Sequence, residues 1–582
     1  MTIVDRARAR LGRLPSAVAR IARRPYWERP APEWLVRRWP DLNATCAAAV
    51  FFWFSVTPTL VPRPWYLQGL VGGITAVIGY AFGALLSTAV RALAVRLPSE
   101  RLRARCWQAF FLVVPALTLV LVAASSVAQQ QLRELQGLPP AHAWNPPVIV
   151  LMAVVLGGLL LTAARAVRLA TRTLIRGLDR RLPRPVAVAS GLLISGALVT
   201  AGLHDVVYER GVVDIAEGIA AQADRITKPG VVRPGTPLVS GSAASLVSWQ
   251  DLGREGRTYI GSVPDARRIA RDTGRPAVQP IRVYVSPGGP EAFADESQDF
   301  DDDARLAVRE LERTRAFDRE VLTIAGTTGS GWVDESLVKP LEYMYGGDTA
   351  TVSLRYSYLP SWLSYLVDKD KAVRASRALV GAVRARLSAL PAGRRPKLLV
   401  TGESLGAYAI ESSYGTLRRL LDQTDGALLA GTPAFSPVSG EIRRRRDAGS
   451  PVWRPQYQRG RNVRVAQFPE RDLARPPDEW RRPRVVQLLN ASDPVVWWTS
   501  DLVLRSPEWL RPPLGPDISP LMRWFPVVTF WQVTLDMAMA YEVPAPHGHR
   551  YGSNPVEGWA AVAAPEGWTG RDTARLKAAM AR

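Results

Sequence analysis

Five long stretches almost free of charge fill the first 205 residues, and they constrain the fold more than any other feature. They lie at about 44–62, 67–90, 107–128, 146–164 and 185–203. A helix needs about 20 apolar residues to cross the hydrocarbon core of a bilayer. Five such stretches in succession favour an all-α transmembrane bundle of about five spans over a buried hairpin of a soluble protein. The first stretch is the weakest, because Pro58 and Pro62 interrupt its end.

The arginines between these stretches predict an orientation. Ten precede the first stretch, and the four connecting loops hold one, five, one and seven. Because arginine-rich loops stay on the cytoplasmic side, the N-terminus is expected in the cytoplasm of a multi-pass cell-membrane protein. Five spans then place the chain after residue 205 outside the cytoplasm. This conclusion depends on an odd number of crossings, and it reverses if residues 44–62 only dip into the membrane.

A net charge of +22 could indicate a protein that binds nucleic acid, but the distribution of the charge along the chain argues against that partner. Residues 1–205 have a net charge of +16 and the remaining 377 residues have +6, so the excess accompanies the apolar stretches. That pattern is typical of a membrane anchor with basic flanks, whose partners are membrane lipids. Two cysteines in 582 residues exclude a disulfide scaffold and a multi-cysteine metal site. We expect neither a cofactor nor a metal, and the sequence does not indicate an oligomeric state.

Composition and periodicity divide the chain into four parts. We expect a basic cytoplasmic segment at 1–43, a transmembrane domain at 44–205, a connector at 206–250 and a mostly parallel α/β domain at 251–582. The stretch 436–483 is rich in Arg and Pro, lacks periodicity and is a candidate surface insertion or lid. Helices are predicted at 301–316 and 368–390. The predicted strands are 281–287, 321–326, 349–358, 397–402, 426–431, 484–490 and 526–534.

One motif in the C-terminal half points to nucleophilic chemistry. A buried apolar strand at 397–402 runs directly into Gly402-Glu-Ser404-Leu-Gly406, and a helix-compatible stretch follows. This context is that of a nucleophile elbow, in which a tight turn presents a serine at the sheet edge and small residues must flank it. The alternative interpretation is an ordinary strand–turn–helix.

Serine is a weak nucleophile and needs a base, and the chain has four histidines. His142 and His204 lie in or next to the apolar half. His547 and His549 follow the last predicted strand, as the chain order Ser, Asp, His requires. We favour His549 as the base and leave His547 open.

The acid is expected at the end of a strand between the serine and these histidines. Asp493 directly follows the predicted strand 484–490, where a carboxylate can orient an imidazole. Asp501 and Asp472 are alternatives with less direct placement. Asp493 could instead only cap a turn or helix before Pro494.

Acyl transfer also needs donors for the developing oxyanion. The backbone N–H of Leu405, directly after the serine, is one expected source. The glycine-rich loop after the strand 321–326 is the other, with Thr327 or Thr328 as the donor. No Walker A pattern is present, so a P-loop is excluded.

With these motifs the sequence resembles actinobacterial membrane proteins that join an N-terminal multi-span domain to a C-terminal α/β-hydrolase domain. The resemblance spans nearly the whole chain and implies the hydrolase fold and a Ser-His-Asp triad, while it says little about substrate. The matching runs are 55–63 (SVTPTLVPR), 329–334 (GSGWVD), 354–362 (LRYSYLPSW), 402–406 (GESLG) and 548–551 (GHRY).

Together these features predict a membrane-anchored serine hydrolase of esterase or lipase type. It would act through an acyl-enzyme on ester-type, lipid or acylated envelope substrates. The same triad would also serve an acyltransferase. A third hypothesis is a non-catalytic binding module or scaffold attached to a channel-like or transporter-like domain. Charged residues inside the spans would favour transport, and the five stretches contain essentially none.

Overall fold

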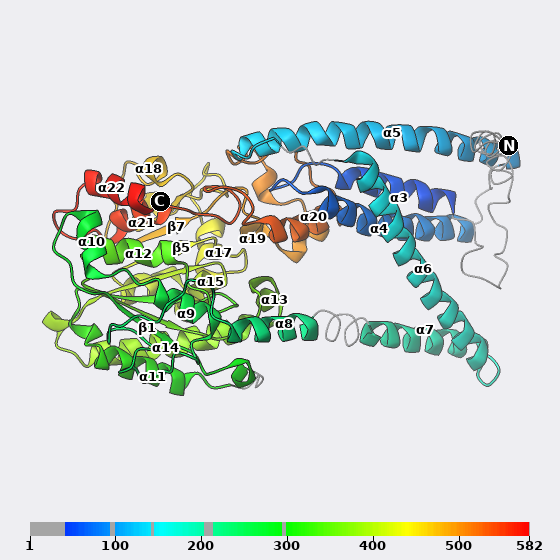
Figure 1. The fold of residues 1–582 in the computed structure, drawn as a ribbon. Helices are drawn as coiled ribbons and strands as arrows, with labels where there is room; N and C mark the ends of the chain where they lie inside the picture. The colour runs from blue at the N-terminus through cyan, green and yellow to red at the C-terminus, as the bar shows by residue number, and fades with distance from the viewer. Residues whose placement is uncertain (1–40, 94–98, 141–144, 203–212, 294–297, 581–582) are drawn as a thin grey trace, which may run out of the picture. The chain divides into compact units, whose positions relative to one another are not determined.

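The computed structural model describes residues 41–93, 99–140, 145–202, 213–293 and 298–580, which form two compact units (Figure 1). The helical unit comprises Met1–Val206 together with Ser500–Pro507 and Ser519–Asp536. The α/β unit comprises Val207–Thr499, Glu508–Ile518 and Met537–Arg582. His142, His204 and nearly all of the basic segment 1–43 lie outside the described residues.

Among the described residues, four helices of the helical unit are of spanning length, whereas the sequence predicts about five spans. The described helices are α3 (Leu42–Ser55), α4 (Trp65–Ala92), α5 (Glu100–Leu135), α6 (Pro146–Leu178) and α7 (Arg184–Ala201). Helices α4 to α7 are long and apolar enough to cross a membrane. Helix α3 has 14 residues and is therefore only about 21 Å long, short of the roughly 30 Å of a bilayer core. It ends at Ser55 because the prolines that follow cannot continue it.

Helix α3 packs closely along α4 in the antiparallel direction. A Cβ added at Gly83 would lie 2.5 Å from the Ala44 backbone, so the two helices touch at backbone distance. At one end, the Ser87 hydroxyl donates to Asp41, which caps α3. At the other end, the Gln68 amide donates to the Ser55 carbonyl. Ser87 comes 19 positions after Gln68, so the two contacts are roughly 28 Å apart along α4.

A buried polar network joins the irregular segment 56–64 to helix α20 (Val528–Asp536) within the helical unit. Gln532 Nε2 donates to the carbonyls of Ser55 and Thr57 at 3.0 and 3.2 Å. Asp536 Oδ2 accepts the Leu60 N–H at 3.1 Å, and Oδ1 lies 3.4 Å from Arg63 Nε. The Arg63 and Asp536 side chains are both fully buried.

Helix α5 completes this network from the other side of the segment. Gln129 accepts the Arg63 backbone N–H, and Gln136 donates to the Leu60 carbonyl. The Ser125 hydroxyl donates to the Val56 carbonyl. Buried non-helical backbone is tolerated only when other groups satisfy its polar atoms, and these side chains do so here.

The predicted strand at 526–534 is wrong, because this segment is the helix α20. A short apolar run does not distinguish a strand from a buried helix by its periodicity. The spacing of Val528, Gln532 and Asp536 puts these three buried side chains on one helical face. Gln532 and Asp536 turn that face toward the segment 56–64, so α20 belongs to the helical unit and adds nothing to the sheet.

The α/β unit is built on a seven-stranded sheet in which every pairing is parallel and the order is β1-β3-β2-β4-β5-β7-β6. Six of the seven predicted strands are confirmed, and β6 lies inside 436–483, so part of that stretch belongs to the sheet. The strands are β1 (Ile281–Val285), β2 (Val321–Gly326), β3 (Thr349–Leu354), β4 (Lys397–Glu403), β5 (Gly426–Ala430), β6 (Val463–Ala466) and β7 (Arg484–Leu488).

Helices cover both faces of this sheet and form two separate apolar cores (Figure 1). The strands are buried almost throughout, which explains why they read as near-continuous apolar runs. One face carries α11 (Asp301–Arg313), α14 (Lys369–Ser388), α15 (Leu405–Tyr414) and α17 (Pro437–Arg444). The other carries α10 (Ala266–Thr273), α12 (Glu335–Met344), α21 (Asn554–Ala563) and α22 (Gly570–Met580).

The Arg63–Asp536 pair provides a stability test of the helical unit. We expect Asp536→Ala to destabilise the unit by about 3–5 kcal/mol, because it leaves a buried guanidinium unpaired. The double variant Arg63→Met with Asp536→Leu should recover most of that loss. Thermal unfolding of the detergent-solubilised protein measures both. The matched control is Asp501→Ala, because its exposed partner Arg505 lies in the same unit. An equal loss in the control would contradict the prediction.

Candidate active site

Ser404 occupies a strained turn between β4 and α15. Its φ of 54° and ψ of −122° lie where a side chain is disfavoured, and such strain is concentrated at functional sites. Ser404 N donates to the Ala430 carbonyl of the neighbouring strand β5 at 3.0 Å, and this bond ties the turn to the sheet. The turn therefore has the local geometry that the elbow interpretation requires.

Three glycines allow the backbones around this turn to meet. A Cβ at Gly402 would lie 2.6 Å from the Gly406 carbonyl carbon, and a Cβ at Gly406 would lie 2.4 Å from the Gly326 oxygen. Strand β2, strand β4 and the first turn of α15 thus touch through backbone atoms alone. The sequence motif contains Gly402 and Gly406, whereas the packing role of Gly326 depends on which strands are neighbours.

Asp493 and His549 form a buried, short hydrogen-bonded pair. His549 Nδ1 lies 2.6 Å from Asp493 Oδ2, and both side chains are at most 1% exposed. The Tyr551 hydroxyl donates to the same carboxylate oxygen at 2.7 Å. Asp493 Oδ1 accepts the Val495 N–H and caps α19 (Pro494–Trp497). Asp493 therefore caps a helix and holds an imidazole at once.

The other candidate side chains have different partners. His547 Nδ1 lies 2.9 Å from Asp517 Oδ2, and that carboxylate also accepts the Ser492 hydroxyl. Asp472 is bound by two arginine side chains and by the amides at 467 and 468. Asp501 belongs to the helical unit, where it faces Arg505. Of the proposed acids, Asp493 is the one that contacts a candidate base.

The His549 ring is packed beside the elbow. A Cβ at Gly431, directly after β5, would lie 2.3 Å from His549 Cε1, so the ring rests on this backbone. Because Ser404 N is bonded to the residue before Gly431, the serine and the imidazole share the carboxyl edge of β4 and β5. The Tyr541 and Tyr551 rings lie 5.0 and 5.9 Å from the imidazole.

A second carboxyl group, which was not predicted from the sequence, faces the same imidazole. Glu403 Oε1 lies 3.6 Å from His549 Nε2 and accepts the Tyr541 hydroxyl at 2.7 Å. Burial raises the pKa of Glu403 well above its usual value, and the nearby Asp334 adds to this shift. In the sequence, Glu403 is the residue between Gly402 and Ser404 of the motif, and its position there was the one indication that it could lie in the site.

The loop after β2 supplies the candidate oxyanion donors. Leu405 is the first residue of α15, so its N–H is among those that a helix leaves without an internal partner. Thr328 N donates to the Trp332 carbonyl within the loop at 2.9 Å. Thr327 follows Gly326 at the point where this strand meets Gly406, which favours its N–H over that of Thr328.

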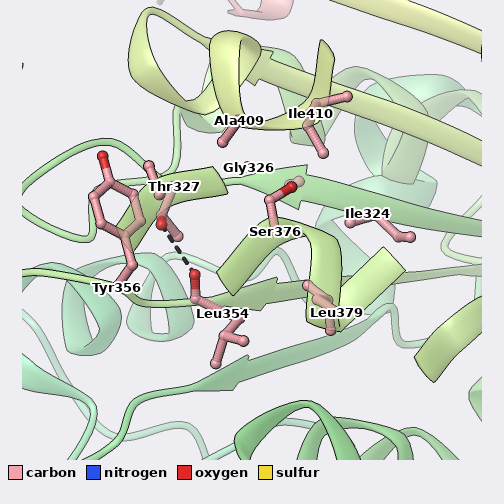
Figure 2. A pocket seen from close by; sticks show the side chains of 11 residues that line it. Ile324, Gly326, Thr327, Leu354, Tyr356, Ser376, Leu379, Ala409 and Ile410 are labelled. Carbon is pink, nitrogen blue, oxygen red and sulfur yellow. Dashed lines mark hydrogen bonds between the residues drawn. The ribbon is translucent and has the colours of Figure 1, made fainter. Parts of the chain in front are cut away.

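Figure 2 shows a small cavity that lies behind this loop, where the Thr327 hydroxyl donates to the Leu354 carbonyl at 3.0 Å. Its volume of about 10 Å³ holds at most one water molecule. It is therefore too small for a substrate. The lining residues are Ile324, Ala325, Gly326, Thr327, Leu354, Tyr356, Ala372, Ser376, Leu379, Ala409 and Ile410.

Aromatic side chains surround the buried Leu405. Tyr365, Val495 and Ala540 form one cluster with it, and Tyr408 and Trp498 pack against that cluster. The Tyr365 ring lies 5.7 Å from the Trp498 ring and 5.2 Å from the Phe435 ring. Phe435 is 39% exposed, so the cluster reaches the surface. Within the described residues, no group of three His, Cys, Asp or Glu side chains is placed to hold a metal ion.

Comparison with known proteins adds two findings. A family model described as the alpha/beta-hydrolase family matches residues 281–576. A model described as the N-terminus of that family matches residues 56–264. No curated protein and no solved structure matches the chain significantly.

The contact between Gly326 and Gly406 can be tested directly. We expect Gly326→Ala to destabilise the α/β unit by about 2 kcal/mol or more, because the new methyl group meets the Gly406 carbonyl oxygen at 2.4 Å. The control is Gly381→Ala inside α14, where a Cβ meets open space, and it should stabilise by about 0.5–1 kcal/mol. Thermal unfolding followed by circular dichroism measures both variants. Equal stability of the two would refute the close approach.

Proposed function

The chain belongs to the α/β-hydrolase family, and from this premise we propose that it is a membrane-anchored serine hydrolase of esterase or lipase type. The substrates are esters of lipid-like or acylated envelope molecules. The observation that supports this proposal most is the buried 2.6 Å contact between His549 and Asp493 beside the strained Ser404.

Each residue of the site has a separate role in the proposed reaction. Ser404 Oγ bonds to the ester carbonyl carbon while its proton passes to His549 Nε2. Asp493 accepts the Nδ1–H, which holds the tautomer and stabilises the imidazolium. The N–H groups of Leu405 and Thr327 donate to the oxyanion. The imidazolium then protonates the leaving alcohol, and an acyl-enzyme remains.

The acyl-enzyme is resolved by a second attack on the same carbonyl. His549 takes a proton from water, the new C–O bond forms, and the bond to Ser404 Oγ breaks as the proton returns to it. An alcohol in place of water makes the same protein an acyltransferase. Product analysis with water and an alcohol in competition separates the two reactions.

The aromatic cluster around Leu405 supports a hydrophobic acyl group. It lies directly beside the residue whose N–H is the expected oxyanion donor, so an acyl chain attached to the reacting carbonyl would run along it. The partly exposed Phe435 gives this cluster an apolar surface. Burial of a chain there gains about 0.8 kcal/mol for each methylene group.

We propose a cytoplasmic N-terminus and an extracytoplasmic hydrolase unit. The network around 56–64 and α20 lies at the end of the bundle where α4 begins and α5 ends. The two loops at that end contain one arginine each, whereas those at the other end contain five and seven. Chain segment 519–536 packs at the arginine-poor end, and the next residue re-enters the α/β unit.

The length of α3 is compatible with this orientation. The contacts at the two ends of α3 lie roughly 28 Å apart along α4, close to the thickness of a bilayer core. Side chains of α5 and α20 form hydrogen bonds with the irregular backbone of 56–64. Our proposal counts α3 with the segment after it as one crossing, which makes the number of crossings odd.

Covalent labelling with a fluorophosphonate probe tests the proposed chemistry. The wild-type protein should label, and Ser404→Ala should lose labelling completely. His549→Ala should slow labelling by about a thousandfold or more, because it removes the base. His547→Ala is the matched control and should label at nearly the wild-type rate. An accessible wild-type protein that never labels would favour a non-catalytic binding module instead.

Cysteine accessibility tests the proposed orientation. The chain has two cysteines, Cys46 and Cys106, which serine can replace before single cysteines are introduced. Gly393→Cys, on an exposed loop of the α/β unit, should react with an impermeant maleimide in intact cells. Arg181→Cys, in the arginine-rich loop between α6 and α7, should react only after permeabilisation. The reverse pattern would place the hydrolase unit in the cytoplasm.

A further inference from the structure

The mechanism above makes no use of Glu403, although this residue directly precedes the nucleophile. Its side chain is 4% exposed and lies at the carboxyl end of β4. Its Oε1 lies 3.6 Å from His549 Nε2, the atom that must accept the serine proton. Glu403 therefore lies where its charge would act most strongly on the base.

The neighbours of Glu403 all bear on its ionisation. Asp334, on the loop between β2 and α12, lies within hydrogen-bonding reach of this side chain and raises its pKa. Two carboxyl groups that lie this close can share a hydrogen bond only if one of them carries a proton. Asp493, at the end of β7, adds further negative charge, and the Tyr541 hydroxyl, on the segment after α20, donates to Oε1.

The balance of these groups favours a neutral Glu403. Burial is the largest cause of the raised pKa, and Asp334 and Asp493 act in the same direction. The hydroxyl of Tyr541 opposes them with a single hydrogen bond. Asp334 itself accepts the N–H and hydroxyl of Ser336 at the start of α12, which fixes its position against Glu403.

An ionised Glu403 would harm the base. A carboxylate within about 4–6 Å raises the pKa of an imidazole by roughly 1–3 pH units. His549 already has one such partner in Asp493, at Nδ1. A second carboxylate at Nε2 would favour the imidazolium form further, and an imidazolium cannot accept the proton of Ser404.

We infer that Glu403 is a positioning residue that stays neutral by sharing a proton with Asp334, and that its neutrality keeps His549 Nε2 free to act as the base. This inference rests on the proposed function. It assigns a role to Asp334, which ends the run 329–334, and to the residue between Gly402 and Ser404.

The pH dependence of fluorophosphonate labelling tests the inference. In this reaction Ser404 Oγ bonds to phosphorus, fluoride leaves, and the Oγ proton passes to His549 Nε2. The labelling rate against pH therefore falls on the acid side with the pKa of His549. The proteins compared are the full-length wild type, Asp334→Asn, Glu403→Gln and the double variant.

The acid limb is the part of the profile where the labelling rate falls as the pH is lowered. Asp334→Asn should move this acid limb to higher pH by about one unit. The asparagine amide donates to Glu403 without sharing a proton, so it stabilises the carboxylate and returns the charge to the site. Asparagine also caps helices well, so the start of α12 is kept. The control is Asp265→Asn, which makes the same change at the cap of α10. It should leave the profile unchanged.

Glu403→Gln should leave the acid limb within about 0.3 pH units of the wild type, because a neutral group replaces a neutral group. The double variant should match Glu403→Gln, since no carboxyl group remains to ionise.

Two results would overturn the inference. One is an acid limb that falls by about a unit in Glu403→Gln, which would mean that Glu403 is ionised in the wild type. The other is an unshifted limb in Asp334→Asn. If that variant does not fold, the Glu403→Gln profile still decides. A wild-type protein that fails to label at every pH overturns the proposed hydrolase function instead, so the two failures are distinct.

Discussion

Three backbones meet without side chains at the carboxyl edge of the sheet, and the candidate site depends on that contact. Gly326, Gly402 and Gly406 bring β2, β4 and α15 to distances at which any Cβ would collide. The close approach holds Ser404 in its strained conformation and sets the Leu405 N–H beside the loop that bears Thr327. Contacts with neighbouring elements maintain this strained conformation, which a single turn could not maintain by itself.

The protein stabilises buried acids in two contrasting ways. In the helical unit, Asp536 lies against the Arg63 guanidinium and accepts the Leu60 N–H, so a cation and a backbone donor pair with the carboxylate. In the α/β unit, Glu403 faces other carboxyl groups and is most stable without its charge. Both arrangements follow from one rule, that a buried charge must be paired or removed.

Much of the fold was predictable from local patterns. The strands at β1, β2, β3, β4, β5 and β7 are continuous apolar runs bounded by turn residues, and they were predicted correctly. Strand β6 was missed because it is four residues long, contains Arg464 and lies in an Arg- and Pro-rich stretch. Helix α20 was predicted as a strand because its apolar run is short, and α3 is shorter than its apolar stretch because two prolines follow Ser55.

The candidate site was predictable only as a set of residue types. The order of Ser404, Asp493 and His549 along the chain suggested their roles, but His547 and His549 are two residues apart and equally placed in sequence. The structure gives them different carboxylates, Asp517 and Asp493. Which carboxylate faces which imidazole depends on how β7 and the final loop pack, and no local pattern encodes that.

The division into an apolar helical half and a parallel α/β half follows from the amino-acid sequence alone, because hydrophobic length and strand–turn–helix chemistry are local properties. Three features depend on tertiary packing: α20 joins the helical unit, Gly326 makes room for Gly406, and Glu403 faces Asp334 and His549. These are contacts between residues tens to hundreds of positions apart. They arise from burial and the need to satisfy buried polar groups, which act on the whole packed chain.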